Sequence, residues 1–76
     1  MFIELTIKTM AGQADIRIDS KQKIGEGLSI LQQRGVLVSK TAPDYFRSAM
    51  NQNLVSAYKT FEEENIFDGD ILSAIE

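Results

Sequence analysis

Alternation of apolar and polar residues opens the chain. In residues 2–8, positions 3, 5 and 7 are aliphatic and polar residues stand between them. A second run at 14–19 repeats this period of two, which is typical of a half-buried strand. Gly12 lies between the runs and favours a turn. The pattern predicts two strands paired as an antiparallel hairpin. Their inward-facing residues are Ile3, Leu5, Ile7, Ala14, Ile16 and Ile18.

The apolar spacing then changes to that of a helix. From Ile24 onward, apolar residues recur at intervals of three and four, which makes one side of a helix apolar. Gly25 and Gly27 weaken this helix, because each costs up to about 1 kcal/mol relative to alanine in a helix interior. Tertiary packing must therefore stabilise it. Gly35 is suited to the left-handed conformation that ends a helix, so we expect the helix to end at Arg34 and to lie across the sheet.

The second half of the chain contains short elements. Pro43 blocks a helix and favours an extended backbone before it. The predicted elements that follow are a strand at 45–50, a turn at 51–53, a short strand at 54–55, a single helical or 3₁₀ turn at 61–66, a tight turn at 68–70 and a last strand at 71–75. The inward residues of the third strand are Phe46, Ser48 and Met50, and its outward residues are Tyr45, Arg47 and Ala49.

The composition lacks two residue types on which many catalytic and metal sites depend. The 76 residues form one domain, and 43% apolar with 25% charged residues is ordinary for a globular chain. The chain has no cysteine and no histidine, so it lacks the thiolate and imidazole ligands and the usual general base. We therefore predict no catalytic residue, no metal and no cofactor. The segment 68–70, Asp-Gly-Asp, lacks the further oxygen ligands of a calcium loop and is predicted to be a plain turn.

Charge and hydropathy restrict the partners. The net charge is −3 with no extended basic cluster, which argues against nucleic acid. The longest apolar run, 36–38, is far below the ~20 residues of a membrane span, so direct membrane insertion is not expected. The first residues read as a strand and not as a signal peptide, which predicts a cytoplasmic protein. Solvent-exposed charge is expected for Glu62–Glu64, and half-buried packing for Tyr45 and Tyr58.

A hairpin, one helix, a strand pair and a closing strand occur in the order of the β-grasp fold. This is an α+β class, with a mixed sheet of four to five strands and one helix packed across it. The segment 8–12 resembles the first hairpin turn of ubiquitin, and Thr60-Phe61 with Asn65-Ile66 resembles the segment before ubiquitin's last strand.

The chain is also similar to the YukD/EsaB family, the ubiquitin-like proteins associated with bacterial type VII secretion systems. The resemblance rests on the early first strand, on the closing stretch at 66–72 (Ile-Phe-Asp-Gly-Asp-Ile-Leu) and on an end without Gly-Gly. It implies a cytoplasmic accessory or regulatory component that binds a protein non-covalently. The partner would be a membrane component or the ATPase of the secretion machine.

The resemblance to ubiquitin also implies a binding surface. Ubiquitin's apolar recognition patch corresponds to Met10, Ala49 and Ile75, and Ala49 and Ile75 belong to the outward residues of their strands. Alanine at the centre implies weak binding to ubiquitin-type receptors. Lys8 and Arg47 are expected to flank these residues as a partly basic polar rim.

Two other functions remain open from the sequence. A sulfur carrier of cofactor synthesis shares this fold, but Glu76 stands where such a carrier needs a glycine carboxylate, which also argues against a conjugated modifier. An adaptor unrelated to secretion is the other, because this fold has many binding functions. We expect a monomer or a weak homodimer, formed through an exposed strand edge at 54–55 or along the second strand.

Overall fold

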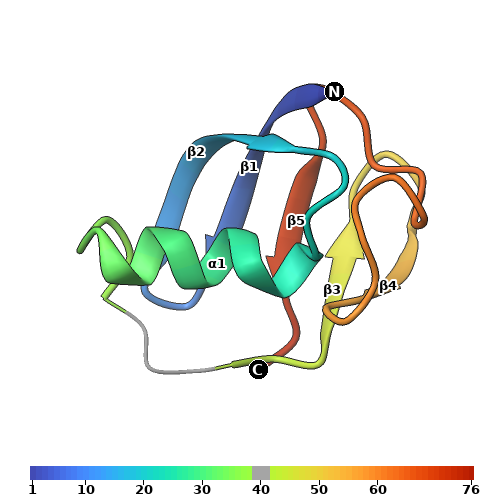
Figure 1. The fold of residues 1–76 in the computed structure, drawn as a ribbon. Helices are drawn as coiled ribbons and strands as arrows, with labels where there is room; N and C mark the ends of the chain where they lie inside the picture. The colour runs from blue at the N-terminus through green and yellow to red at the C-terminus, as the bar shows by residue number, and fades with distance from the viewer. Residues whose placement is uncertain (39–41) are drawn as a thin grey trace.

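A computed structural model of the chain describes residues 1–38 and 42–76. Over these residues the elements are, in order, β1 (Phe2–Thr9), β2 (Gly12–Asp19), α1 (Ile24–Gln33), β3 (Tyr45–Ser48), β4 (Asn53–Ser56) and β5 (Ile71–Ala74). The strands form one five-stranded sheet in the order β2-β1-β5-β3-β4. β1 and β5 are parallel, whereas the other neighbours are antiparallel. α1 crosses one face of the sheet (Figure 1). The predicted α+β class, with a mixed sheet and one helix, is confirmed.

The hydrophobic core lies between α1 and the sheet. The hairpin register pairs Ile3 with Ile18 and Leu5 with Ile16, so the predicted inward face of the hairpin is correct, with Ala14 half-buried and packed against the core. The core residues are Ile3, Leu5, Ile7, Ile16, Ile18, Ile24, Leu28, Leu31, Leu37, Phe46, Val55, Ala57, Phe61, Ile66 and Leu72.

Close approach explains both glycines of α1. A Cβ atom on Gly27 would lie 3.1 Å from Ile7 Cδ1 and 3.2 Å from Phe61 Cζ. A Cβ atom on Gly25 would lie 3.1 Å from the Ala57 carbonyl oxygen, which accepts the Gly25 N–H at 2.9 Å. α1 therefore contains two residues of low helix propensity because glycine, which has no Cβ atom, lets the helix pack this closely against its neighbours.

A buried carboxylate joins the start of β5 to the turn after β3. Asp70 is only 1% exposed. Its Oδ2 accepts the Ser48 hydroxyl at 2.5 Å, and its Oδ1 accepts the N–H groups of Met50 at 3.0 Å and Ile71 at 2.8 Å. The Ser48 oxygen in turn accepts the Asn51 N–H at 3.1 Å. Since buried polar groups need such partners, this cluster determines how the chain leaves β3.

The ends of several elements differ from the sequence prediction. β3 ends at Ser48, so Ala49 and Met50 belong to a turn, and Met50 is 58% exposed and does not face inward. β5 ends at Ala74, one residue before the predicted end. The end of α1 is as predicted, because Arg34 is its C-cap and Gly35 follows in the left-handed conformation at φ 71°. β4 covers four residues where a strand of two was predicted.

The two tyrosines also differ from prediction. Tyr45 is 52% exposed and Tyr58 is 68% exposed, so neither is a half-buried packing residue. The Tyr58 hydroxyl donates a hydrogen bond to Asp44 at 2.5 Å, and this bond raises the pKa of Tyr58.

The segment 61–66 forms a single turn, as predicted, but two of its three glutamates have structural partners. Glu63 Oε1 accepts the Thr60 N–H at 2.9 Å, and the Thr60 hydroxyl accepts the Glu63 N–H at 3.0 Å. Glu64 Oε2 accepts the Ser56 N–H at 2.7 Å. The spacing Thr-x-x-Glu is that of a capping box, a signal that was present in the sequence. Glu62 and Glu63 are exposed, as expected, and Glu64 is half-buried; the expectation missed the hydrogen bonds that Glu63 and Glu64 make.

Glu63 gives a pH-dependent prediction. Its hydrogen bonds to the Thr60 backbone and side chain hold the pKa of Glu63 below its ordinary value of 4.5. A carboxyl whose folded pKa is lowered contributes stability above the unfolded pKa, and this contribution is lost as the pH falls through the folded pKa. We expect Glu63→Gln to be less stable than wild type in urea at pH 7, with the difference shrinking towards pH 3. A difference that stays constant over this range would contradict the role of the charge.

Within 1–38 and 42–76, no helix has the length and apolarity needed to cross a membrane. The segment 68–70 is a turn, as predicted, with Gly69 at φ 85°. Asp68 Oδ1 accepts the Glu4 N–H at 2.7 Å, so both aspartates of the turn bond the protein itself. The described part of the chain holds no group of three side chains that could bind a metal ion.

Candidate partner-binding surface

The candidate surface is the face of the sheet that points away from α1, here called the open face. Strand register aligns side chains across it. Lys8 on β1 pairs with Ser73 on β5, which pairs with Arg47 on β3, which pairs with Leu54 on β4. Because paired residues of neighbouring strands lie on the same face, these four side chains form one row across the open face.

Two further rows flank this one. The Ile75 N–H donates to the Tyr45 carbonyl at 3.0 Å, and the Ala49 N–H donates to the Ile71 carbonyl at 3.0 Å. These bonds continue the register of β3 and β5 by one residue at each end. Tyr45 and Ile75 therefore lie on one side of the central row, and Ile71 and Ala49 lie on the other. At about 3.3 Å per residue, the two isoleucines are roughly 13 Å apart along the strand.

Met10 lies at the tip of the β1–β2 hairpin and is 91% exposed. Its backbone N–H donates to Glu76 Oε2 at 3.0 Å. This bond joins the hairpin tip to the residue that follows Ile75. Met10 is therefore close to the Tyr45 and Ile75 end of the open face.

The structure divides the five predicted residues. Lys8 and Arg47 lie in the central row of the open face, and Ile75 and Met10 lie at one end of it. Ala49 lies at the other end, beside Ile71. Ala49 is exposed, but it follows β3 and is not part of the strand as predicted.

Sequence reasoning missed three large apolar side chains of this face. Tyr45 is 52% exposed, Leu54 is 49% exposed and Ile71 is 41% exposed. The signal available was their outward position in alternating strands, but the sequence does not say which outward residues become neighbours. The apolar-basic patch is defined here as Lys8, Tyr45, Arg47, Leu54, Ile71 and Ile75.

The charges of the open face are separated. Lys8 and Arg47 lie near its centre, and neither forms an ion pair with a carboxylate among the described residues. On the β1–β2 side, a shallow depression is lined by Phe2, Glu4, Leu5, Thr6, Asp15, Arg17, Asp68 and Gly69. The face therefore has a basic, apolar centre and a more acidic flank.

Comparison with solved structures identifies the fold as ubiquitin-like. A designed protein based on ubiquitin matches with a TM-score of 0.68 and 23% identity, over 97% of this chain and 87% of that one. The ubiquitin-like domain of Plasmodium falciparum Dsk2 matches with a TM-score of 0.61 and 12% identity, over 99% of this chain and 100% of that one. The C-terminal ubiquitin-like domain of mouse tubulin-specific chaperone e matches with a TM-score of 0.61 and 11% identity, over 96% of this chain and 84% of that one. No protein-family model and no curated protein matches the chain.

Proposed function

We propose that this chain is a non-covalent protein-interaction module and not an enzyme, with the apolar-basic patch as its contact surface. The supporting observation is that four large apolar side chains, each between 41% and 52% exposed, lie around Arg47 on the sheet, with Lys8 in the same row two strands away. Exposed aromatic and aliphatic side chains with an arginine are typical of the energetic centre of a protein interface. Two of the similar structures are themselves ubiquitin-like domains.

We further propose that the partner is a membrane component or the ATPase of a bacterial type VII secretion system. This chain would then be an accessory or regulatory subunit in the cytoplasm. The support is the resemblance of the closing stretch at 66–72 to the YukD/EsaB family. In the structure this stretch contains the buried Asp70 and the patch residue Ile71.

Substitutions in the patch test this proposal. We expect Ile75→Asp and Arg47→Glu to reduce capture of the partner at least about tenfold in pull-downs from the source cells, because central interface residues contribute about 2 kcal/mol or more. Mass spectrometry of the captured proteins identifies the partner. The matched control is Val36→Asp, because Val36 is also apolar and 53% exposed but lies outside the open face.

The results separate the two parts of the proposal. Folded patch variants that capture the partner as well as wild type does would refute the binding surface. A partner that depends on the patch but belongs to no secretion system would leave the interaction module standing and remove the secretion role. Circular dichroism of each variant confirms that it is folded.

A further inference from the structure

The sheet has two edge strands, and one of them is partly closed. Of the four residues of β4, Ser56 turns its backbone groups away from β3. Its N–H donates to Glu64 Oε2 at 2.7 Å, and its carbonyl accepts the Lys59 N–H at 3.3 Å. The loop that follows β4 therefore occupies the backbone of Ser56. Leu54, opposite Arg47, is the other residue of β4 whose backbone points outward, so β4 offers the backbone of one residue for pairing with another strand.

The outer edge of β2 is open. Thr6 and Glu4 of β1 bond away from β2, since the Thr6 N–H donates to the Asp70 carbonyl at 3.0 Å and the Glu4 carbonyl accepts the Gly69 N–H at 2.8 Å. Asp15 lies opposite Thr6, and Arg17 lies opposite Glu4. In an antiparallel pair, residues opposite such positions also direct their backbone groups away from the partner strand. Asp15 and Arg17 therefore present free backbone donors and acceptors at the edge.

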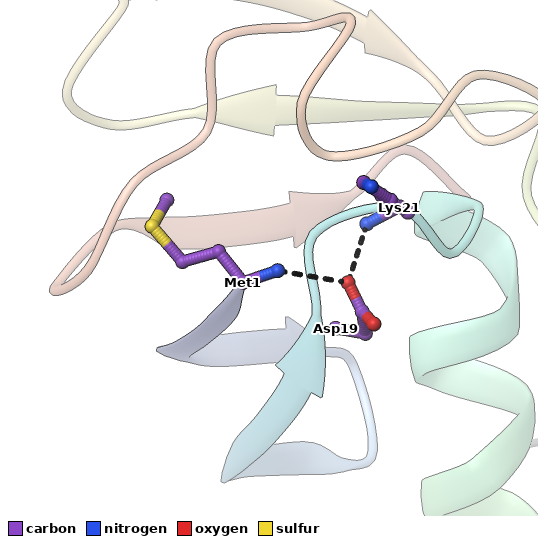
Figure 2. Close-up of polar contacts among 3 residues, drawn as sticks. All are labelled: Met1, Asp19 and Lys21. Atoms are coloured by element: carbon purple, nitrogen blue, oxygen red, sulfur yellow. Dashed lines mark hydrogen bonds and ion pairs between the residues drawn. The ribbon is translucent and has the colours of Figure 1, made fainter.

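The end of β2 limits this open edge. Asp19 Oδ1 accepts the Lys21 N–H at 3.0 Å and lies 3.4 Å from the Met1 amino group (Figure 2). The Asp19 carbonyl accepts the Gln22 N–H at 3.0 Å. The hydrogen bond from the Lys21 N–H is the main reason that the pKa of Asp19 is lowered. The available edge is therefore centred on Asp15, Ile16 and Arg17.

We propose that a second copy of this chain pairs with that edge, joining β2 to β2 antiparallel about a two-fold axis at Ile16. In this register Asp15 lies opposite Arg17 of the second copy, and Arg17 lies opposite its Asp15. The pairing makes four backbone hydrogen bonds and two opposite-charge pairs. When two copies of the segment Asp-Ile-Arg run antiparallel, the acidic end of each faces the basic end of the other. This charge complementarity favours a second copy of the chain as the strand that pairs with the β2 edge.

The same charges disfavour the neighbouring registers. An axis at Asp15 would place the two Asp15 carboxylates opposite each other, and an axis at Arg17 would oppose the two guanidinium groups, which is unfavourable. On the helix side of the sheet, the axis at Ile16 brings the two Ile16 side chains together. Each is 6% exposed in the single chain.

The dimer is independent of the proposed function. β2 and the pair β3 and β4 lie at opposite ends of the sheet, so the apolar-basic patch stays open in both copies (Figure 1). The contact is weak, because Arg17 already lies 5.3 Å from the centre of the Phe2 ring and Asp15 already accepts the Thr6 hydroxyl at 2.6 Å. A dissociation constant in the high micromolar range is expected.

Charge exchange tests the register. Sedimentation measures the average mass of the purified chain at concentrations from about 20 µM to about 2 mM. A dimer with a dissociation constant in the high micromolar range becomes populated within this range. Asp15→Arg and Arg17→Asp each turn both pairs into like-charge pairs, so each variant alone is expected to bind itself at least about tenfold more weakly. Mixed together, the two variants again form opposite-charge pairs and are expected to dimerise with each other. Hydrogen exchange of the Asp15 and Arg17 amides should slow with rising concentration.

Lys59→Asp is the matched control, because it makes the same change in net charge as Arg17→Asp but lies beyond β4, at the far edge of the sheet. It should dimerise as wild type does. A wild-type chain that is monomeric up to about 2 mM overturns the proposal, whether or not the edge accepts a strand of a different protein. A dimer that persists in both single-charge variants, or a mixture of them that stays monomeric, overturns it as well.

Discussion

Phe61→Ala is expected to lower the free energy of unfolding by about 4 kcal/mol. The Phe61 side chain is 0% exposed, and its ring lies directly under α1 where Gly27 allows the close approach. Its removal loses the burial of the ring and leaves a cavity that α1 and β1 cannot fill, because both are fixed by their own hydrogen bonds. A domain of this size is stable by only roughly 4–11 kcal/mol, so the variant should be near unfolding at 25 °C. Urea denaturation followed by circular dichroism measures the loss.

Phe67→Ala is the matched control for this substitution. Phe67 follows the same turn but is 56% exposed, so we expect a loss below about 1 kcal/mol. Phe61→Leu keeps most of the apolar volume and should lose less than Phe61→Ala. Equal losses from Phe61→Ala and Phe67→Ala would show that Phe61 is not in the core.

Asp70→Ala is expected to cost about 3 kcal/mol, although it replaces a charged residue with an apolar one. The substitution leaves the Ser48 hydroxyl and the Met50 and Ile71 N–H groups without their acceptor. Each buried polar group that loses its partner costs about 1–3 kcal/mol, and relaxation of the turn recovers part of the total. Chemical denaturation at neutral pH tests this result.

Asp68→Ala is the control for Asp70, because Asp68 is exposed and accepts a single backbone N–H. Its expected cost is about 1 kcal/mol. A cycle with Ser48→Ala should show a coupling energy of about 1 kcal/mol or more between Ser48 and Asp70, since they share a direct hydrogen bond. If the two substitutions are additive, the buried carboxylate does not hold the turn after β3.

Much of the fold was predictable because its signals are local. The alternation of β1 and β2 and the helical spacing after Ile24 depend only on neighbouring residues, and all three elements were predicted within a few residues of their observed bounds. The end of β3 was not predictable in this way. Alternation continues through Met50, but Asp70, twenty positions later, accepts the Met50 N–H and turns the chain after Ser48.

The candidate site was predictable only in part. Alternation indicated that Arg47 and Ile75 face outward, but the rows of the open face depend on the register of β1, β5 and β3, which are distant in sequence. Ala49 therefore lies beside Ile71, away from Met10 and Ile75. The register also places Tyr45 beside Ile75 and Leu54 beside Arg47, which makes both residues part of the patch.

The amino-acid sequence by itself determined the order and type of the elements, the lack of cysteine and histidine, and which residues of the hairpin face inward. Periodicity and composition are enough for these properties, because they arise between residues close along the chain. Only the tertiary structure decided why Gly25 and Gly27 stand in a helix, where β3 ends, which outward residues form a patch and which sheet edge stays open. Each of these depends on contacts between distant segments, and such contacts form only when the whole chain has packed.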